Sequence, residues 1–157
     1  MNIQLYAIGK TDQKLIEELT DIYTKRLGHY INFDFTIIPD IKNTKNLSIE
    51  QQKNEEGKLI MKQLETSDFV ILLDENGKEF SSVNFSAYLQ KRMNTGLKRL
   101  VFIIGGPYGF STEVYNRANS KLSLSKMTFS HQMIRVFFIE QLYRAFTILR
   151  NEPYHHQ

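Results

Sequence analysis

Residues 99–114 read "RLVFIIGGPYGFSTEV", and this stretch joins an apolar strand, a glycine loop and the start of a helix. Its first six residues form the near-continuous apolar run that is typical of a strand covered on both faces. Glycines follow at 105, 106 and 109, and glycine lets a backbone turn sharply or approach a ligand closely. The loop is therefore either a tight turn or part of a binding site, and these residues alone favour neither.

The same alternation of strand and helix extends along the chain. Short β-rich runs predict strands at 2–8, 31–38, 68–73, 99–104 and 121–124. Apolar residues at helical spacing predict helices at 12–27, 48–64, 82–94, 111–119 and 131–150. Strands that alternate with helices favour a parallel sheet. We therefore predict an α/β fold, with a mostly parallel sheet of five to six strands and helices on both faces, as a single domain over residues 1–157.

The composition excludes several classes of protein. The chain of 157 residues contains no cysteine and has a net charge of +3. Without thiols it forms neither disulfides nor thiolate metal sites, and we expect no bound metal. No apolar run approaches the roughly 18 residues of a membrane-spanning helix, and the first ten residues do not resemble a signal peptide. We expect a cytoplasmic protein without a membrane partner.

Charge is divided unevenly between the two halves of the chain. Residues 1–80 carry ten Lys and Arg against fourteen Asp and Glu, whereas residues 81–157 carry ten against three. Clustered cations bind a phosphate backbone by displacing its counterions, so the basic half indicates a nucleic-acid partner. Alternatively, the two halves interleave in the fold and their charges mix.

The last predicted helix, at 131–150, is apolar on nearly every bearing. A sheet covers only one side of a helix, and three large apolar side chains left in water would forgo roughly 5 to 9 kcal/mol. A second copy of the chain would cover them, so we expect a homodimer. A helix buried entirely within one chain is the alternative.

Two short motifs can be tested by their spacing. The glycine loop is not a P-loop, because Phe and Ser follow its last glycine where a P-loop has Lys and then Ser or Thr. It lacks the spacing of a dinucleotide fingerprint and has no Lys or Arg between Gly105 and Glu113, so it fits a ligand held by backbone groups. The segment "DENGKE" at 74–79 lacks the carboxylates of a calcium loop and instead predicts a turn at Asn76–Gly77.

In an open parallel sheet, ligands bind beyond the carboxyl ends of the strands. Leu73 and Gly105 end two predicted strands, and the Ser/Thr-rich loop of "LSLSKMTFSHQ", residues 122–132, follows a third. Such a loop offers backbone groups and hydroxyls that can read a flat heterocycle. Capping of the next helix by Thr128 or Ser130 is the alternative. We predict a small-molecule site at these three strand ends.

The residues assembled so far resemble the SPOUT-class RNA methyltransferases, and within that class the ribosomal RNA large subunit methyltransferase H family. The matches are "AIGK" at 7–10, "YTKRLGHY" at 23–30, "LDENGKEFSS" at 73–82, "FIIGGPYG" at 102–109 and the long C-terminal stretch that begins at Leu122. This resemblance implies a homodimer with a C-terminal trefoil knot. It also implies S-adenosylmethionine as cofactor and methylation of N3 of a pseudouridine in 23S rRNA of the assembled ribosome.

Carried over by position, the resemblance places the cofactor against three segments: Leu73, Gly105, and the run Leu124, Ser125, Lys126, Met127, Thr128 and Phe129. S-adenosylmethionine has a sulfonium cation and no phosphate, which suits a glycine loop without lysines. The sequence departs from the family at Ser130, where proline usually precedes "HQ". Serine is a good N-cap, so we expect the helix start to survive.

Methyl transfer to a ring nitrogen also needs a base for the N3 proton. The resemblance of the tail "YH" favours His155, with Tyr154 to stack on a nucleotide base and Arg144 to hold a phosphate or a carboxylate. Pro153 stops the last helix, and we expect the released tail to lie beside the cofactor site. A disordered chain end is the alternative.

Two other functions remain open. One is a non-catalytic, response-regulator-like α/β module, although "AIGKTD" at the end of the first strand lacks an acidic cluster. The other is an RNA-binding protein without catalysis. Binding of S-adenosylmethionine separates the methyltransferase from both.

Overall fold

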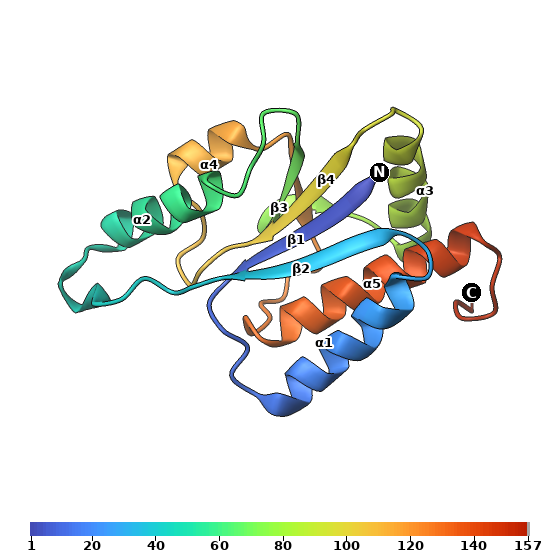
Figure 1. Ribbon diagram of the computed structural model, residues 1–157, viewed down its shortest axis with the longest axis horizontal. Coiled ribbons are helices and arrows are strands. Elements are labelled where there is room, and N and C mark those ends of the chain that lie inside the picture. Colours follow the sequence, from blue (N-terminus) through green and yellow to red (C-terminus); the bar gives the residue numbers. More distant parts are fainter. Residues whose placement is uncertain (157) are drawn as a thin grey trace.

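The computed structural model describes residues 1–156 (Figure 1). The strands are β1 (Asn2–Ile8), β2 (Asn32–Ile38), β3 (Phe69–Glu79), β4 (Arg99–Ile104) and β5 (Ser120–Ser123). The helices are α1 (Lys14–Leu27), α2 (Ile49–Met61), α3 (Ser82–Met93), α4 (Thr112–Arg117) and α5 (Met133–Leu149), with a short 3₁₀ helix at Thr44–Asn46. The predicted strands and helices are all present, and most of their ends are shifted by a few residues.

The strands form one sheet in the order β2-β1-β4-β3-β5, and every neighbouring pair is parallel. Side chains along β4 alternate between the two faces of the sheet: Leu100, Phe102 and Ile104 join one buried cluster, whereas Val101 and Ile103 join the other. A strand that is buried on both faces has no polar side, which explains its continuous apolar run. The predicted α/β fold with a parallel sheet of five strands is confirmed.

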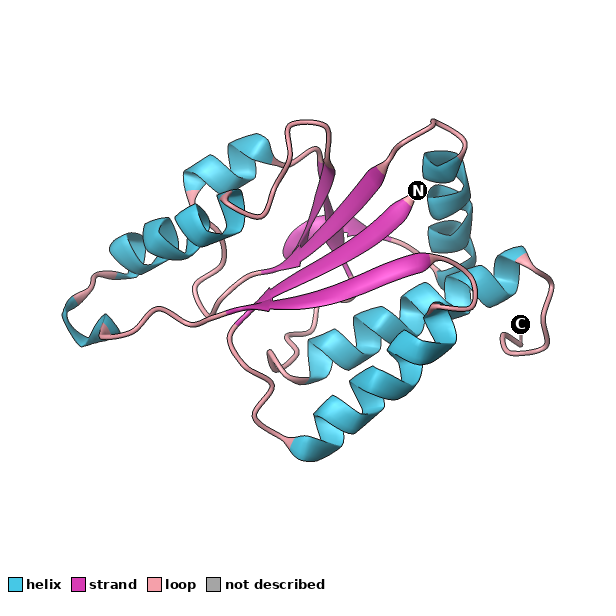
Figure 2. Cartoon of the chain, in the orientation of Figure 1, coloured by secondary structure: helices cyan, strands magenta, loops and turns pink. Residues whose placement is uncertain are grey.

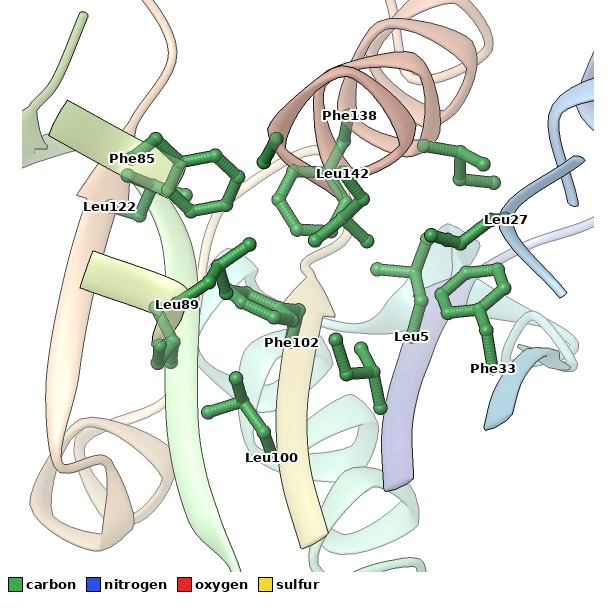
Figure 3. Close-up of a cluster of buried hydrophobic side chains, with 14 of the residues drawn as sticks. Leu5, Leu27, Phe33, Phe85, Leu89, Leu100, Phe102, Leu122, Phe138 and Leu142 are labelled. Atoms are coloured by element: carbon green, nitrogen blue, oxygen red, sulfur yellow. The ribbon is translucent and has the colours of Figure 1, made fainter. Parts of the chain in front are cut away.

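Helices cover both faces of the sheet. Figures 1 and 2 show α1, α3 and α5 on one face and α2 with α4 on the other. The larger apolar cluster lies under α5, where Phe138 and Leu142 meet Phe102 of β4 (Figure 3). The Phe102 and Phe138 rings are 4.7 Å apart. The smaller cluster joins Ile60 of α2 and Val114 of α4 to the opposite face.

Helix α5 is covered mostly within its own chain, since it packs on the sheet between α1 and α3. Only Met133 and Phe137 of its large apolar side chains are exposed, by 37% and 41%. The two flanking helices supply the cover that the sheet does not, so the alternative of a helix buried within one chain accounts for most of its apolar surface. The homodimer stays a prediction. None of the helices within residues 1–156 is long and apolar enough to cross a bilayer.

Strand β3 continues past its predicted end and pairs with β5 through Lys78 and Glu79, after an irregularity that follows Leu73. The predicted turn at Asn76–Gly77 is wrong. A Cβ on Gly77 would lie 2.5 Å from the carbonyl carbon of Leu122, so the glycine lets the two backbones approach. Gly77 does mark a position where the backbone needs glycine, but the reason is the closeness of β5 and not a turn.

Candidate functional site

A cavity of about 430 Å³ opens at the carboxyl ends of β4 and β5 and of the first segment of β3, which ends at the irregularity after Leu73. Its walls are residues 73–76, 104–110, 122–125 and 127–129, together with Tyr115, His131 and Ile134. This is the edge at which open parallel sheets bind ligands, and the volume lies within the usual range of about 300 to 1,000 Å³ for small-molecule sites. The three predicted segments therefore converge on one cavity.

The predicted cofactor residues Leu73, Gly105, Leu124, Ser125, Met127, Thr128 and Phe129 all lie on the wall. Lys126 does not line the cavity, and its side chain is exposed. The loop is held by its own polar groups: Ser125 Oγ accepts a hydrogen bond from the Met127 N–H at 3.0 Å. Ser130 Oγ accepts from the Met133 N–H at 3.1 Å, so the expected start of the last helix is preserved without proline.

The glycine loop is both a tight turn and a place of close approach. Gly109 has a φ of +79°, and its N–H donates to the Gly106 carbonyl at 3.2 Å. A Cβ on Gly105 would lie 3.0 Å from the ring of Phe110, and a Cβ on Gly106 would lie 2.3 Å from Glu56 Oε2. One side of the loop therefore lines the cavity, and the other packs against the side chains of Phe110 and Glu56.

Glu56 of α2 supports this loop from below and is only 3% exposed. Its Oε1 accepts a hydrogen bond from Gln52 Nε2 at 3.0 Å, whereas Oε2 has no partner among the described residues. Burial raises the pKa of the Glu56 carboxyl, because the charged form loses its hydration, and Asp40 adds to the effect. A buried carboxylate at this position could not be predicted from the sequence, because α2 has the pattern of an ordinary amphipathic helix.

Several wall residues were not predicted from the sequence, and Asp74 and Tyr115 are the best defined of them. Tyr115 of α4 donates its hydroxyl to Asp74 Oδ2 at 2.5 Å. Burial, and then this bond, raise the pKa of Tyr115 to about 12. Asp74 follows directly after the predicted end of the strand, so the rule that ligands bind at strand ends would have identified it.

Arg144, Tyr154 and His155 lie together but away from the cavity. Arg144 Nη2 is 2.6 Å from Glu140 Oε1, which also accepts the Tyr154 hydroxyl at 2.9 Å. Figure 1 shows the chain end folded back beside the C-terminal end of α5. Arg144 lies about 15 Å along this helix from Ile134 on the cavity wall. The expectation that the tail lies beside the cofactor site is wrong within a single chain, because α5 separates the two.

The tail through residue 156 is ordered. The Glu152 N–H donates to the Thr147 carbonyl at 2.9 Å, and Tyr30 donates its hydroxyl to the Glu152 carboxylate. The Tyr154 ring packs edge-on against Tyr143 at 4.7 Å. These contacts exclude the alternative of a disordered end for the residues that the structure describes.

One ring nitrogen of His155 is engaged by Arg144. Arg144 Nη1 is 3.3 Å from His155 Nδ1, and an arginine only donates, so Nδ1 accepts. The lone pair on Nδ1 is therefore not free while Arg144 keeps this contact.

Half of the cations in residues 81–157 are engaged inside the fold. Arg135, for example, is 1% exposed and donates to the carbonyls of Ile8 and Gly9 at 2.8 Å each. Arg99 pairs with Asp68 at 3.0 Å. The others are Arg92 over two aromatic rings, Arg117 on backbone carbonyls and Arg144 on Glu140. Fewer cations of the basic half are therefore free on the surface than the sequence suggests, in agreement with the alternative that the charges of the two halves mix in the fold.

The fold and the cavity at three strand ends define a class of protein, and comparison with known families identifies it. Residues 1–155 match the family described as "Predicted SPOUT methyltransferase". The chain belongs to the SPOUT methyltransferase family. A solved structure, "The structure of a probable methylase family protein from Haemophilus influenzae Rd KW20", matches 99% of this chain and 71% of that chain with a TM-score of 0.55. At 14% identity it supports the fold alone.

Within the family, the chain is similar over its full length to proteins named "Ribosomal RNA large subunit methyltransferase H". The protein of Christiangramia forsetii is 70% identical and that of Flavobacterium johnsoniae 69%, each over 157 residues and 100% of both chains. The protein of Parabacteroides distasonis is 62% identical over the same length. The resemblance seen in the sequence is confirmed.

Proposed function

We propose that this methyltransferase uses S-adenosylmethionine to methylate N3 of a pseudouridine in 23S rRNA of the assembled ribosome, in the cytoplasm. The full-length similarity to proteins named ribosomal RNA large subunit methyltransferase H supports the class of substrate. The observation that carries the cofactor proposal is the convergence of three chain segments on one cavity.

The cavity fits S-adenosylmethionine in size and in chemistry. Apolar side chains, among them Leu73, Leu122 and Leu124, line it beside loop backbone, which suits an adenosine held by apolar contacts and main-chain hydrogen bonds. The described wall includes Asp74 and Glu75 but no Lys or Arg. A cofactor with a sulfonium and an ammonium group suits such a wall, whereas a nucleoside polyphosphate does not.

When bound, the cofactor supplies an electrophilic methyl group, and its sulfur keeps the bonding electron pair as the methyl passes to nitrogen. The residues of the chain need only orient the two reactants and accept the N3 proton. The wall segments 104–110, 122–125 and 127–129 would orient the cofactor by contacts from two sides of the cavity. Removal of the proton requires a base beside the nucleotide.

We assign that role to His155, delivered by the tail of a second copy of the chain. The tail and the cavity of one chain lie at opposite ends of α5, so a complete site of both parts needs two chains. Exposed apolar side chains on the neighbouring helices α1 and α5 offer a surface for the second copy: Leu15, Leu19 and Ile22, with Met133 and Phe137. The trefoil knot that the resemblance implies stays a prediction.

Arg144 would then control the base. An RNA phosphate competes with His155 for the guanidinium, because Arg pairs strongly with phosphate. Release of the contact at Nδ1 frees a lone pair on the imidazole for the N3 proton. Tyr154, whose ring lies 4.6 Å below the Arg144 guanidinium carbon, is placed to stack on a nucleotide base.

The experiment that tests the function is methylation mapping. Ribosomes from a strain that lacks this protein should lack one methylated pseudouridine in 23S rRNA, and the purified protein with S-adenosylmethionine should restore it. Restoration at a different nucleotide would change the proposed target. Unchanged modification in the deletion strain would refute the proposed function.

A further inference from the structure

The fixed charges on the cavity wall are negative. Asp74 and Glu75 lie on it at the carboxyl end of the first segment of β3, and the wall within residues 1–156 has no Lys or Arg to balance them. The nearby Lys121 does not line the cavity, and its ammonium lies 5.6 Å from the centre of the Tyr115 ring. A positive charge in the cavity therefore meets carboxylates and no fixed cation.

Asp74 is the carboxylate that the structure holds in place. Its Oδ2 accepts the Tyr115 hydroxyl at 2.5 Å, and its Oδ1 accepts the Asn76 N–H at 2.8 Å. Tyr115 is itself fixed, because its ring packs edge-on against the buried ring of Phe110 at 5.7 Å. Because the pKa of Tyr115 is raised to about 12, its phenol stays protonated and donates to Asp74 throughout the physiological range of pH.

Glu75 differs from Asp74 in its surroundings. It is exposed, so water screens its charge, whereas Asp74 is half-buried. Asp74 lines the cavity itself, so a positive charge bound beside it meets a carboxylate that water screens only in part.

Methyl transfer changes the charge of the ligand by one unit. S-adenosylmethionine has a sulfonium, whereas the product S-adenosylhomocysteine has a neutral thioether in its place; the adenosine, amino and carboxylate groups are the same in both. Apolar and backbone contacts therefore hold both ligands almost equally, and only a charge can discriminate strongly between them.

We propose that Asp74, fixed by Tyr115 and the Asn76 N–H, makes the cavity prefer the sulfonium cofactor over its neutral product. The same residue thereby promotes release of the product once the methyl group has left. This inference rests on the proposed function, because it takes S-adenosylmethionine as the cofactor. It adds a specificity-determining residue to that site.

Calorimetric titration of the full-length protein tests the inference without any RNA. The ligands are S-adenosylmethionine, S-adenosylhomocysteine and sinefungin, in which a protonated amine replaces the sulfonium. Asp74→Asn should weaken binding of the two cationic ligands by about tenfold, while the Kd of S-adenosylhomocysteine changes less than about threefold; tenfold corresponds to about 1.4 kcal/mol, within reach of one partly screened charge. Asparagine keeps the size of the side chain. Its one carbonyl oxygen can accept from the Asn76 N–H as Oδ1 does now, and its amide can donate to the Tyr115 hydroxyl in place of the present bond.

Two further variants separate charge from structure. Tyr115→Phe removes the hydroxyl that fixes Asp74 but keeps the carboxylate, so it should lower the preference for the cation by a smaller factor. Asp21→Asn makes the same change of charge at an exposed position of α1 and should leave all three affinities unchanged. For the wild type, the preference should also shrink as salt is added.

The outcomes are distinct. Equal weakening of all three ligands by Asp74→Asn would mean that Asp74 binds the shared amino group, and would overturn the inference, as would unchanged affinities in a folded variant. If the wild-type protein binds none of the three ligands, that result contradicts the proposed function itself and not only the role of Asp74. Thermal unfolding of each variant shows whether it is folded.

Discussion

Gly106 of the glycine loop packs against the buried carboxylate of Glu56, so closely that a Cβ on the glycine would lie 2.3 Å from Glu56 Oε2. A second contact of this kind lies one residue along α2, where a Cβ on Gly57 would lie 2.3 Å from Ser111 Oγ. Helix α2 therefore supports both the loop and the start of α4. The shape of the cavity depends on a helix that does not line it.

Gly106→Ala should destabilise the protein by roughly 1 to 3 kcal/mol, the usual cost of forcing extra volume into a packed region. Urea denaturation measures the change. Glu56→Ala removes the atoms that the new methyl group would strike. The double variant should therefore be less destabilised than the sum of the two single variants, and strict additivity would show that the contact with Glu56 is not the cause.

Glu56→Gln should stabilise the protein increasingly as the pH rises. The folded state raises the pKa of Glu56 above its ordinary value of 4.5, so it holds this proton more tightly than the unfolded state. Stability from this group is therefore fully present below about pH 4.5 and is lost as the pH rises through the raised pKa. Denaturation at about pH 5 and about pH 8 should give a larger gain for the variant at the higher pH. Parallel pH profiles of the two proteins would contradict this.

Gly105→Ala should weaken binding of S-adenosylmethionine by roughly tenfold. The new Cβ would lie 3.0 Å from the Phe110 ring, which packs on Tyr115, so the wall around Asp74 would shift. Calorimetry measures the affinity. Gly28→Ala is the control, because Gly28 has a helical φ of −58°, a Cβ there would come no closer than 3.4 Å to the Lys25 carbonyl oxygen, and the position lies outside the cavity wall. Unchanged affinity in a folded Gly105 variant would remove this glycine from the site.

Light scattering at micromolar concentration should give twice the chain mass of 18.5 kDa.

Mixing of two inactive variants then tests whether the sites are shared between chains. The His155→Ala chain lacks the proposed base, and the Gly105→Val chain has a damaged cavity. After random mixing, about half of the dimers contain one chain of each kind, and one of the two sites in such a dimer has both an intact cavity and an intact tail. The mixture should therefore regain about a quarter of wild-type activity. A mixture as inactive as its components would mean that each site is built within one chain.

His155→Ala should lower methyl transfer on whole ribosomes by roughly 10² to 10⁴, the usual contribution of a general base. Single-turnover assays isolate this step, and the affinity for S-adenosylmethionine should not change, because the proposed role of His155 is to take the N3 proton and not to bind the cofactor. His156→Ala is the matched control, because His156 is the exposed neighbour in the same tail. If both variants transfer the methyl group at the wild-type rate, His155 is not the base.

Much of the candidate site could be predicted because it lies at the ends of strands. Leu73, Gly105 and the run from Leu124 follow apolar segments that are recognisable from composition, and parallel strands bring their carboxyl ends to one edge. Asp74 also lies at the end of a predicted strand, but it was not predicted as a site residue, because its segment was interpreted as a turn on the basis of Asn-Gly, a common turn sequence. Tyr115 gave no such signal, because it lies in α4 beyond the glycine loop, whereas His131 falls within the predicted segment 122–132.

The sequence by itself determined the order and kind of the strands and helices, the two-faced burial of β4 and the convergence of three segments. These features depend on the periodicity of apolar residues and on backbone limits of glycine, which act between near neighbours. Only the tertiary structure decided that α1 and α3 cover α5, that Gly77 serves a strand pairing, that Glu56 supports Gly106, and that the tail lies at the far end of α5. Each of these contacts joins residues distant in the chain, and its existence depends on how whole elements pack, which no local pattern records.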